Sequence, residues 1–186
     1  VIEEINQNLK GYHFDRATAR SYEFFWDEFC AYYVEMAKPV LFRKVGNAEL
    51  REHKQKMLVI LLLQALRLMH PIAPFITEEI FHLIKEQLNQ VTQNEAADPY
   101  TKDAIKALLS PACIVAPYPQ VIQKEDINAE VEEQFHFMNE IVYAIRNVRA
   151  EMQLPPNLAT DLIILAPKED RSLHTVESNQ SILSSL

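Results

Sequence analysis

The chain has 186 residues, of which 48% are hydrophobic and 24% are charged, and its formal net charge is −8. That length suits one domain with a small addition, and it can bury a core without disulfides or a structural metal. The acidic balance argues against a general binder of nucleic acid or of anionic membranes. Only two glycines are present, and because tight hairpins depend on glycine, the composition favours helices over sheets.

The cysteines and the apolar runs indicate the cellular compartment, and the chain ends indicate that the sequence is a fragment. Cys30 and Cys113 lie far apart, among apolar residues and in no metal-binding spacing. They are typical of buried free thiols in a reducing, cytosolic setting, with a zinc or redox role as the alternative. The longest apolar run, residues 57–63, is too short to cross a bilayer, so no membrane contact is predicted. Both ends of the sequence lie inside helical patterns, and we expect the chain to be part of a longer polypeptide.

Residues 1–9 have the spacing of a short helix, and the next predicted helix covers residues 22–38. The apolar side chains of this second helix recur at three- and four-residue steps. They are Tyr22, Phe25, Trp26, Phe29, Tyr33, Met36 and Ala37. Asp15 is a suitable N-cap, and Pro39 is expected to close the helix, because the residue before a proline disfavours helical geometry. So many rings need partner helices, which predicts a core position for this helix, Trp26 included.

A third helix is predicted over residues 48–69, with apolar residues around nearly its whole circumference in the second half, which should be buried. Its first half carries Arg51, Lys54 and Lys56 instead. Residues 38–70 hold seven Lys or Arg against two Glu. Two interpretations stay open: a solvated helix face, or a face that contacts phosphate groups.

Pro71 and Pro74 must interrupt that helix, because neither has an amide hydrogen to donate. A new helix is expected to resume by Thr77, whose hydroxyl is suited to cap it. His70 and His82 flank this stretch. No third ligand has a suitable spacing, so no metal site is predicted.

The middle of the chain has weaker patterns. Residues 89–100 are polar and lack periodicity, which indicates a surface loop. Residues 101–109 suit a short helix. Residues 113–116 are apolar and bounded by prolines, and they are expected to be extended.

A second long helix is predicted over residues 128–152, with an apolar stripe along almost all of it. Arg146, Asn147 and Arg149 lie near its C-terminal end. The helix dipole alone favours arginines there. Two arginines and an asparagine on adjacent turns are also good donors to phosphates and base edges. Both interpretations stay open.

The last part of the sequence changes character. Residues 160–166 are rich in branched side chains, which is typical of a strand, and residues 173–186 have a helical spacing. We therefore expect a mainly α fold: a helical bundle over residues 1–154, followed by a small partial α/β appendage over residues 155–186.

No catalytic constellation stands out. The sequence has no glycine-rich phosphate loop, no Gly-x-Ser-x-Gly motif and no Cys–His pair at a plausible spacing. Glu78 and Glu79 are adjacent, so they diverge around a helix and make a poor acid/base pair. The residues alone indicate a binding module with one basic side, and no catalytic, cofactor-binding or metal-binding residue is predicted.

Four stretches resemble one known family, in order across residues 12–154. They are Phe24–Pro39, Leu66–Phe81, Ala116–Pro119 and Ile145–Met152. The second stretch is shared by the isoleucyl, leucyl, methionyl and valyl members of the class I tRNA synthetases. The Trp-Asp-Glu-Phe-Cys helix and the Arg-Asn-Val-Arg-Ala-Glu segment are more specific. The sequence thus resembles the anticodon-binding domain of valyl-tRNA synthetases.

The resemblance implies a helical bundle of the class I anticodon-binding type. Such a bundle binds the anticodon stem-loop of valine tRNA and positions the tRNA for the catalytic domain of the same polypeptide, in a cytoplasmic enzyme that we expect to be a monomer. The parent enzyme, a valine–tRNA ligase, would join valine to its tRNA with ATP and magnesium. The His-Ile-Gly-His and Lys-Met-Ser-Lys-Ser signatures that bind ATP in class I synthetases are absent. This chain is therefore expected to bind no cofactor and to lack aminoacylation activity of its own.

The candidates for tRNA contact are, in order of preference, Arg146, Asn147 and Arg149, then Arg51, Lys54 and Lys56. The arginines would bind phosphates, and Asn147 would contact the edge of a splayed loop base. Trp26 is expected to be packed in the core, with stacking on an anticodon base as the alternative. Two alternatives stay open. One is the same domain of an isoleucyl or leucyl enzyme, and the other is a helical scaffold that binds another protein instead of RNA.

Overall fold

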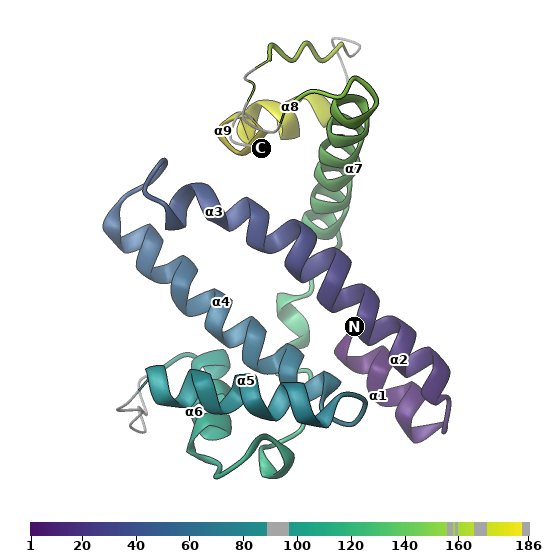
Figure 1. Cartoon of the computed structure of the whole chain (residues 1–186), viewed down its shortest axis with the longest axis vertical. Coiled ribbons are helices and arrows are strands. Elements are labelled where there is room, and N and C mark those ends of the chain that lie inside the picture. The colour runs from purple at the N-terminus through teal and green to yellow at the C-terminus, as the bar shows by residue number, and fades with distance from the viewer. Residues whose placement is uncertain (89–96, 156–157, 159, 166–170, 184–186) are drawn as a thin grey trace. The chain divides into compact units, whose positions relative to one another are not determined.

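The structure is a computed structural model that describes residues 1–88, 97–155, 158, 160–165 and 171–183. The chain divides into two compact units, Val1–Lys124 and Glu125–Leu186. Among the described residues every regular element is a helix (Figure 1), which confirms the mainly α fold class. No helix in this part of the chain has the length and apolar character needed to span a membrane.

The first unit is organised around a long central helix. It contains α1 (Ile2–Lys10), α2 (Phe14–Glu23), the π-helix η1 (Phe24–Val34), α3 (Glu35–Leu41), α4 (Ala48–Met69), α5 (Pro74–Gln87), α6 (Pro99–Leu109) and the 3-10 turn η2 (Cys113–Val115), and a second 3-10 turn, η3 (Lys124–Asp126), crosses into the second unit. Helices α1 and α2 pack against each other, while α4 contacts α2, α3, α5 and α6. Helix α4 has the predicted bounds, and the amide of Leu50 donates to its N-cap Asn47 at 2.8 Å.

The main core lies where α4 meets α5, α6 and η2. Its buried members are Ile60, Leu63, Leu66, Phe81, Ala104, Ala107, Leu108 and Cys113. The second half of α4 is therefore buried, as predicted. Truncating one of its leucines to alanine is expected to cost about 2–5 kcal/mol, from lost transfer energy and the cavity left behind.

The aromatic-rich helix predicted over residues 22–38, called the aromatic helix below, contains an uncommon geometry. Phe24–Val34 form an 11-residue π-helix, in which hydrogen bonds connect residues five apart instead of four. Aromatic rings stack along it at four-residue steps. The ring centroids of Phe25 and Phe29 are 6.0 Å apart, and those of Phe29 and Tyr33 are 6.3 Å apart.

The predicted apolar stripe of this helix is only partly buried. Phe29 and Ala37 are buried as predicted, but Trp26 is 56% exposed and Tyr22 is 59% exposed. Tyr32, which lies outside the predicted stripe, is only 2% exposed. Each residue of the wider π-helix turns through a smaller angle than in an α-helix, so a stripe inferred at α-helical spacing shifts around the axis. The prediction that Trp26 lies in the core is wrong.

The ends of the aromatic helix also differ from the prediction. The helix begins at Phe14, not after an Asp15 cap, and it continues through Pro39 to Leu41. Proline keeps a helical φ and lacks only the donor. The carbonyl of Pro39 accepts the amide of Lys44 at 2.8 Å just after the helix end, which lies at Leu41, three residues later than expected.

Three further elements correct the sequence-based prediction. Helix α5 begins at Pro74, a favoured first position for proline, so Thr77 lies inside it and does not cap it. Helix α6 is capped by Asp98, which accepts the amide of Thr101 at 2.9 Å. Cys113–Val115 form a 3-10 turn where an extended segment was expected, because contacts distant in sequence hold them there. Of the predicted loop at 89–100, residues 89–96 lie outside the described residues.

The second unit contains α7 (Ala129–Glu151), α8 (Arg171–Ser178) and α9 (Gln180–Leu183). Helix α7 agrees with the prediction to within one residue at each end. Its N-cap Asn128 accepts the amides of Glu130 and Val131 at 3.0 and 3.3 Å. Helix α7 contacts α8 within this unit.

The predicted strand does not form in the part of it that the structure describes. Residues 160–165 belong to neither helix nor strand, and residue 166 lies outside the described residues. A strand needs a neighbour to satisfy its backbone hydrogen bonds, and the described residues of this unit provide none. The proposed division of the chain after residue 154 falls inside the second unit and stays a prediction.

Candidate nucleic-acid interface

Two of the three predicted basic residues of α4 face the aromatic helix. The Nε of Arg51 donates to the carbonyl of Leu41 at 2.9 Å, across the corner between α3 and α4. One turn further, the Nζ of Lys54 lies 5.8 Å from the ring centroid of Tyr33, a cation–π distance. The structure therefore brings Arg51 and Lys54 together on one side of α4.

Lys56 points to a different neighbour. Its Nζ lies 2.9 Å from Oδ2 of Asp98, the N-cap of α6. Hydrogen bonds from Thr101, and then from Lys56, hold the pKa of Asp98 well below its ordinary value. Lys56 thus stabilises the junction of α4 and α6, and it does not share a face with Arg51 and Lys54.

Arg149 is occupied by the chain that follows α7. Its guanidinium donates to the hydroxyl of Thr160 at 2.8 Å and to the carbonyls of Pro155 and Leu158 at 3.0 and 2.8 Å. These bonds fold the segment after α7 back onto the helix end. A phosphate would have to compete with them, so the structure gives Arg149 a local structural role.

Arg146 and Asn147 lie on the exposed surface of α7. Tyr143, which is 67% exposed, precedes them by three and four residues, and such residues are neighbours on a helix surface. Tyr143 was not predicted from the sequence. The signal that could have found it is an aromatic residue one turn before the arginine and asparagine.

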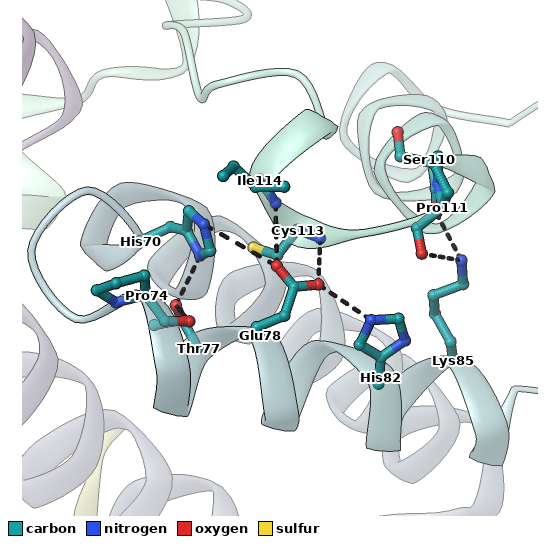
Figure 2. Close-up of polar contacts among 10 residues, drawn as sticks. All are labelled: His70, Pro74, Thr77, Glu78, His82, Lys85, Ser110, Pro111, Cys113 and Ile114. Carbon is teal, nitrogen blue, oxygen red and sulfur yellow. Dashed lines mark hydrogen bonds and ion pairs between the residues drawn. The ribbon is translucent and has the colours of Figure 1, made fainter.

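A polar cluster around Glu78 of α5 was also not predicted (Figure 2). The Glu78 carboxylate accepts the amides of Cys113 and Ile114 at 2.7 and 3.2 Å. His82 Nε2 lies 3.1 Å from one carboxylate oxygen, and His70 Nε2 lies 4.0 Å from the other. Burial raises the pKa of Glu78, but the two amide bonds and the nearby histidines outweigh it, and the pKa lies below its ordinary value.

The contacts around Glu78 indicate a structural role and not a catalytic one. Lys85 of the same helix donates to the carbonyl of Ser110 at 2.5 Å, so α5 holds the segment after α6 at two places (Figure 2). A cavity of about 390 Å³ beside the cluster is lined in part by His70 and Cys113. Burial, with the charge of Glu78, raises the pKa of the Cys113 thiol to about 11, so at neutral pH it is not the thiolate that nucleophilic chemistry needs. No group of three or more potential metal ligands occurs within the described residues.

The comparisons with known proteins agree with one another. The sequence profile of the family described as the anticodon-binding domain of tRNA ligase matches residues 1–164. The valine–tRNA ligase of Protochlamydia amoebophila is 51% identical over 186 residues, which are 100% of this chain and 19% of that protein. Those of Chlamydia caviae and Chlamydia felis are 39% and 38% identical over 168 residues, which are 90% of this chain and 18% of each protein. The chain thus spans about one fifth of the length of these relatives.

Proposed function

The chain belongs to the family of anticodon-binding domains of tRNA ligases, and from that premise we propose that it binds the anticodon stem-loop of valine tRNA. The polypeptide it serves is then a valine–tRNA ligase, a cytoplasmic, monomeric enzyme that joins valine to tRNA with ATP and magnesium. This domain positions the tRNA for the catalytic domain of the same polypeptide. The observation that carries the proposal is the 51% identity to a valine–tRNA ligase along the whole chain.

Phosphate binding on the first unit falls to the basic residues of α4. Arg51 uses its Nε for the Leu41 carbonyl, and its terminal N–H groups have no hydrogen-bond partner among the described residues, which leaves them for phosphate oxygens. Lys54 adds a second cation one turn away. Lys56 stays a candidate, although binding a phosphate would weaken its ion pair with Asp98.

On the second unit the proposed contacts are Arg146 for a phosphate and Asn147 for the edge of an unpaired base. Tyr143 adds an exposed ring beside them, on which a base could stack. Arg149 stays a candidate contact, and its three hydrogen bonds support a second role in shaping the helix end that carries the other two.

Fluorescence anisotropy with a labelled anticodon stem-loop of valine tRNA tests the proposal. We expect weak binding at low salt that weakens steeply as salt rises, with a log–log slope of about −0.7 to −0.9 for each phosphate contact. A stem-loop with an isoleucine anticodon is the matched control, and tighter binding to it would favour the isoleucyl alternative. No binding, or binding that ignores salt, would contradict the proposal and favour a protein-binding scaffold.

A further inference from the structure

The corner between α3 and α4 carries an aromatic residue followed directly in the sequence by two cations. We define this corner as residues 42–46; it lies at the end of α4 away from α5 and α6 (Figure 1). Phe42 is 69% exposed, and Arg43 and Lys44 are exposed as well. Within the part of the chain that the structure describes, neither cation has an ion pair or a side-chain hydrogen bond.

The backbone fixes the shape of the α3–α4 corner. The amides of Lys44 and Val45 both donate to the carbonyl of Pro39, at 2.8 and 3.2 Å. Arg43 has a φ of 60°, a left-handed conformation that is uncommon for a bulky residue and that occurs preferentially at functional sites. Gly46 has a φ of 83°, and a Cβ there would lie 2.7 Å from a side-chain atom of Leu50. The three exposed side chains are therefore held on a shaped loop.

The electrostatics of this region differ from those of the whole chain. The net charge of the chain is −8, yet residues 38–56 contain six Lys or Arg against two Glu, and residues 42–47 contain no carboxylate. Arg51 adjoins the corner through its bond to Leu41. A local cationic surface on an acidic protein attracts polyanions to one place.

We propose that the α3–α4 corner binds an unpaired stretch of RNA, with Phe42 stacked on a base and with Arg43 and Lys44 on the adjoining phosphates. An exposed aromatic ring with adjoining cations suits single-stranded nucleic acid, because every unpaired base offers a free π-face. The bases of a duplex are already stacked on both faces, so the ligand is a loop and not a stem. This inference rests on the proposed function and adds a contact surface to it.

Two substitutions at the corner separate stacking from charge. Phe42→Leu removes the ring and keeps an apolar side chain, whereas Lys44→Gln removes one charge. Phe75→Leu on α5, where the phenylalanine is 91% exposed, and Lys106→Gln on the exposed surface of α6 are the matched controls. Binding to a labelled RNA hairpin and to its loop-free duplex is measured by anisotropy over a range of salt. Circular dichroism confirms that each variant keeps its helix content.

We expect Phe42→Leu to weaken hairpin binding at least about fivefold, with the salt slope and duplex binding unchanged. Lys44→Gln should reduce the magnitude of the salt slope by about 0.7, and the controls should bind as the unmodified chain does. If the corner variants bind the hairpin as the unmodified chain does, this inference is overturned and the proposed function stands. The same holds if Phe75→Leu loses as much hairpin affinity as Phe42→Leu. Failure of the unmodified chain to bind any hairpin would overturn both.

Discussion

Arg67 carries a positive charge into the interior of the first unit. It is 2% exposed, and its guanidinium donates to Asp103 Oδ2 at 2.5 Å and to the carbonyl of Pro117 at 2.8 Å. The sequence analysis counted this arginine in the basic stretch at 38–70. A charge count cannot tell an internal cation from a surface one, so the basic surface of α4 is confined to its first half.

Loss of the Arg67 side chain should destabilise the first unit. Arg67→Ala leaves Asp103 and the Pro117 carbonyl without their partner, and breaking such a buried pair typically costs about 3–5 kcal/mol. Urea unfolding followed by the fluorescence of Trp26, the only tryptophan, measures the change. Lys102→Ala on the exposed surface of α6 is the control, expected within about 0.5 kcal/mol of the unmodified chain. A loss below about 1 kcal/mol for Arg67→Ala would show that the bonds of Arg67 add little.

The two arginines near the end of α7 should respond differently to truncation. Arg149→Ala removes three hydrogen bonds to the segment after α7, so we expect it to lower the melting temperature of the second unit. Arg146→Ala should mainly weaken stem-loop binding. Thermal melting by circular dichroism and anisotropy with the stem-loop separate the two effects. If both variants melt earlier and bind RNA normally, both arginines are structural, and their assignment as RNA contacts is wrong.

At the scale of elements, the sequence predicts the long α-helices well, but it predicts the π-helix and the segment at 160–165 poorly. Helices α4 and α7 agree with prediction because each combines a long apolar stripe with an asparagine N-cap, both of which are local signals. The π-helix has no such signal, so Trp26 was assigned to the buried face and Tyr32 was left out of it, while Phe29 was assigned correctly. The strand at 160–165 failed for the opposite reason, since branched residues favour a strand only where a partner strand exists.

The candidate interface was predictable in composition but not in arrangement. The basic character of Arg51, Lys54 and Lys56 is visible in the sequence. Their neighbours are not, because Leu41, Tyr33 and Asp98 lie 10, 21 and 42 positions away along the chain. The α3–α4 corner could have been found from the adjacent Phe-Arg-Lys residues. Its backbone shape could not, because neither the left-handed conformation of Arg43 nor the bonds to the Pro39 carbonyl have a signal in the sequence.

The contact between α5 and η2 should make the first unit sensitive to acid. Because the pKa of Glu78 lies below its ordinary value of 4.5, its ionised form stabilises the fold above that pH, and this stability is lost as the pH falls below it. Glu78→Gln should cost about 1–3 kcal/mol at neutral pH, since the side-chain amide keeps only one of the two acceptor oxygens and carries no charge.

The pH dependence of urea unfolding checks this expectation. The stability of the unmodified chain should decline below pH 4.5, and that of Glu78→Gln should decline less. Glu79→Gln is the matched control, because Glu79 is the exposed neighbour on the same helix. Equal stability and equal pH dependence for Glu78→Gln and Glu79→Gln would show that the Glu78 contacts do not hold η2.

At the scale of the whole chain, the distribution of charge favours a localised interface. Six of the 18 Lys and Arg residues lie within residues 38–56, where Arg43, Lys44 and Lys56 are exposed, and the exposed Arg146 lies on α7 of the second unit. The remaining surface carries the excess of carboxylates that makes the net charge −8. Such a distribution favours binding of RNA at a few places and repels it elsewhere.

Two boundaries are available for dividing the chain, and truncation distinguishes them. The compact units meet between residues 124 and 125, whereas the sequence predicts a boundary after residue 154. A chain that ends at residue 154 keeps α7 but removes α8, which contacts it, so it should expose apolar surface and bind more of a hydrophobic dye. A chain that ends at residue 124 should keep the core of α4, α5 and α6 and unfold cooperatively in urea, with Trp26 fluorescence as the reporter. If the longer piece unfolds cooperatively and the shorter one does not, α7 belongs with the first helices and the boundary after residue 154 is correct.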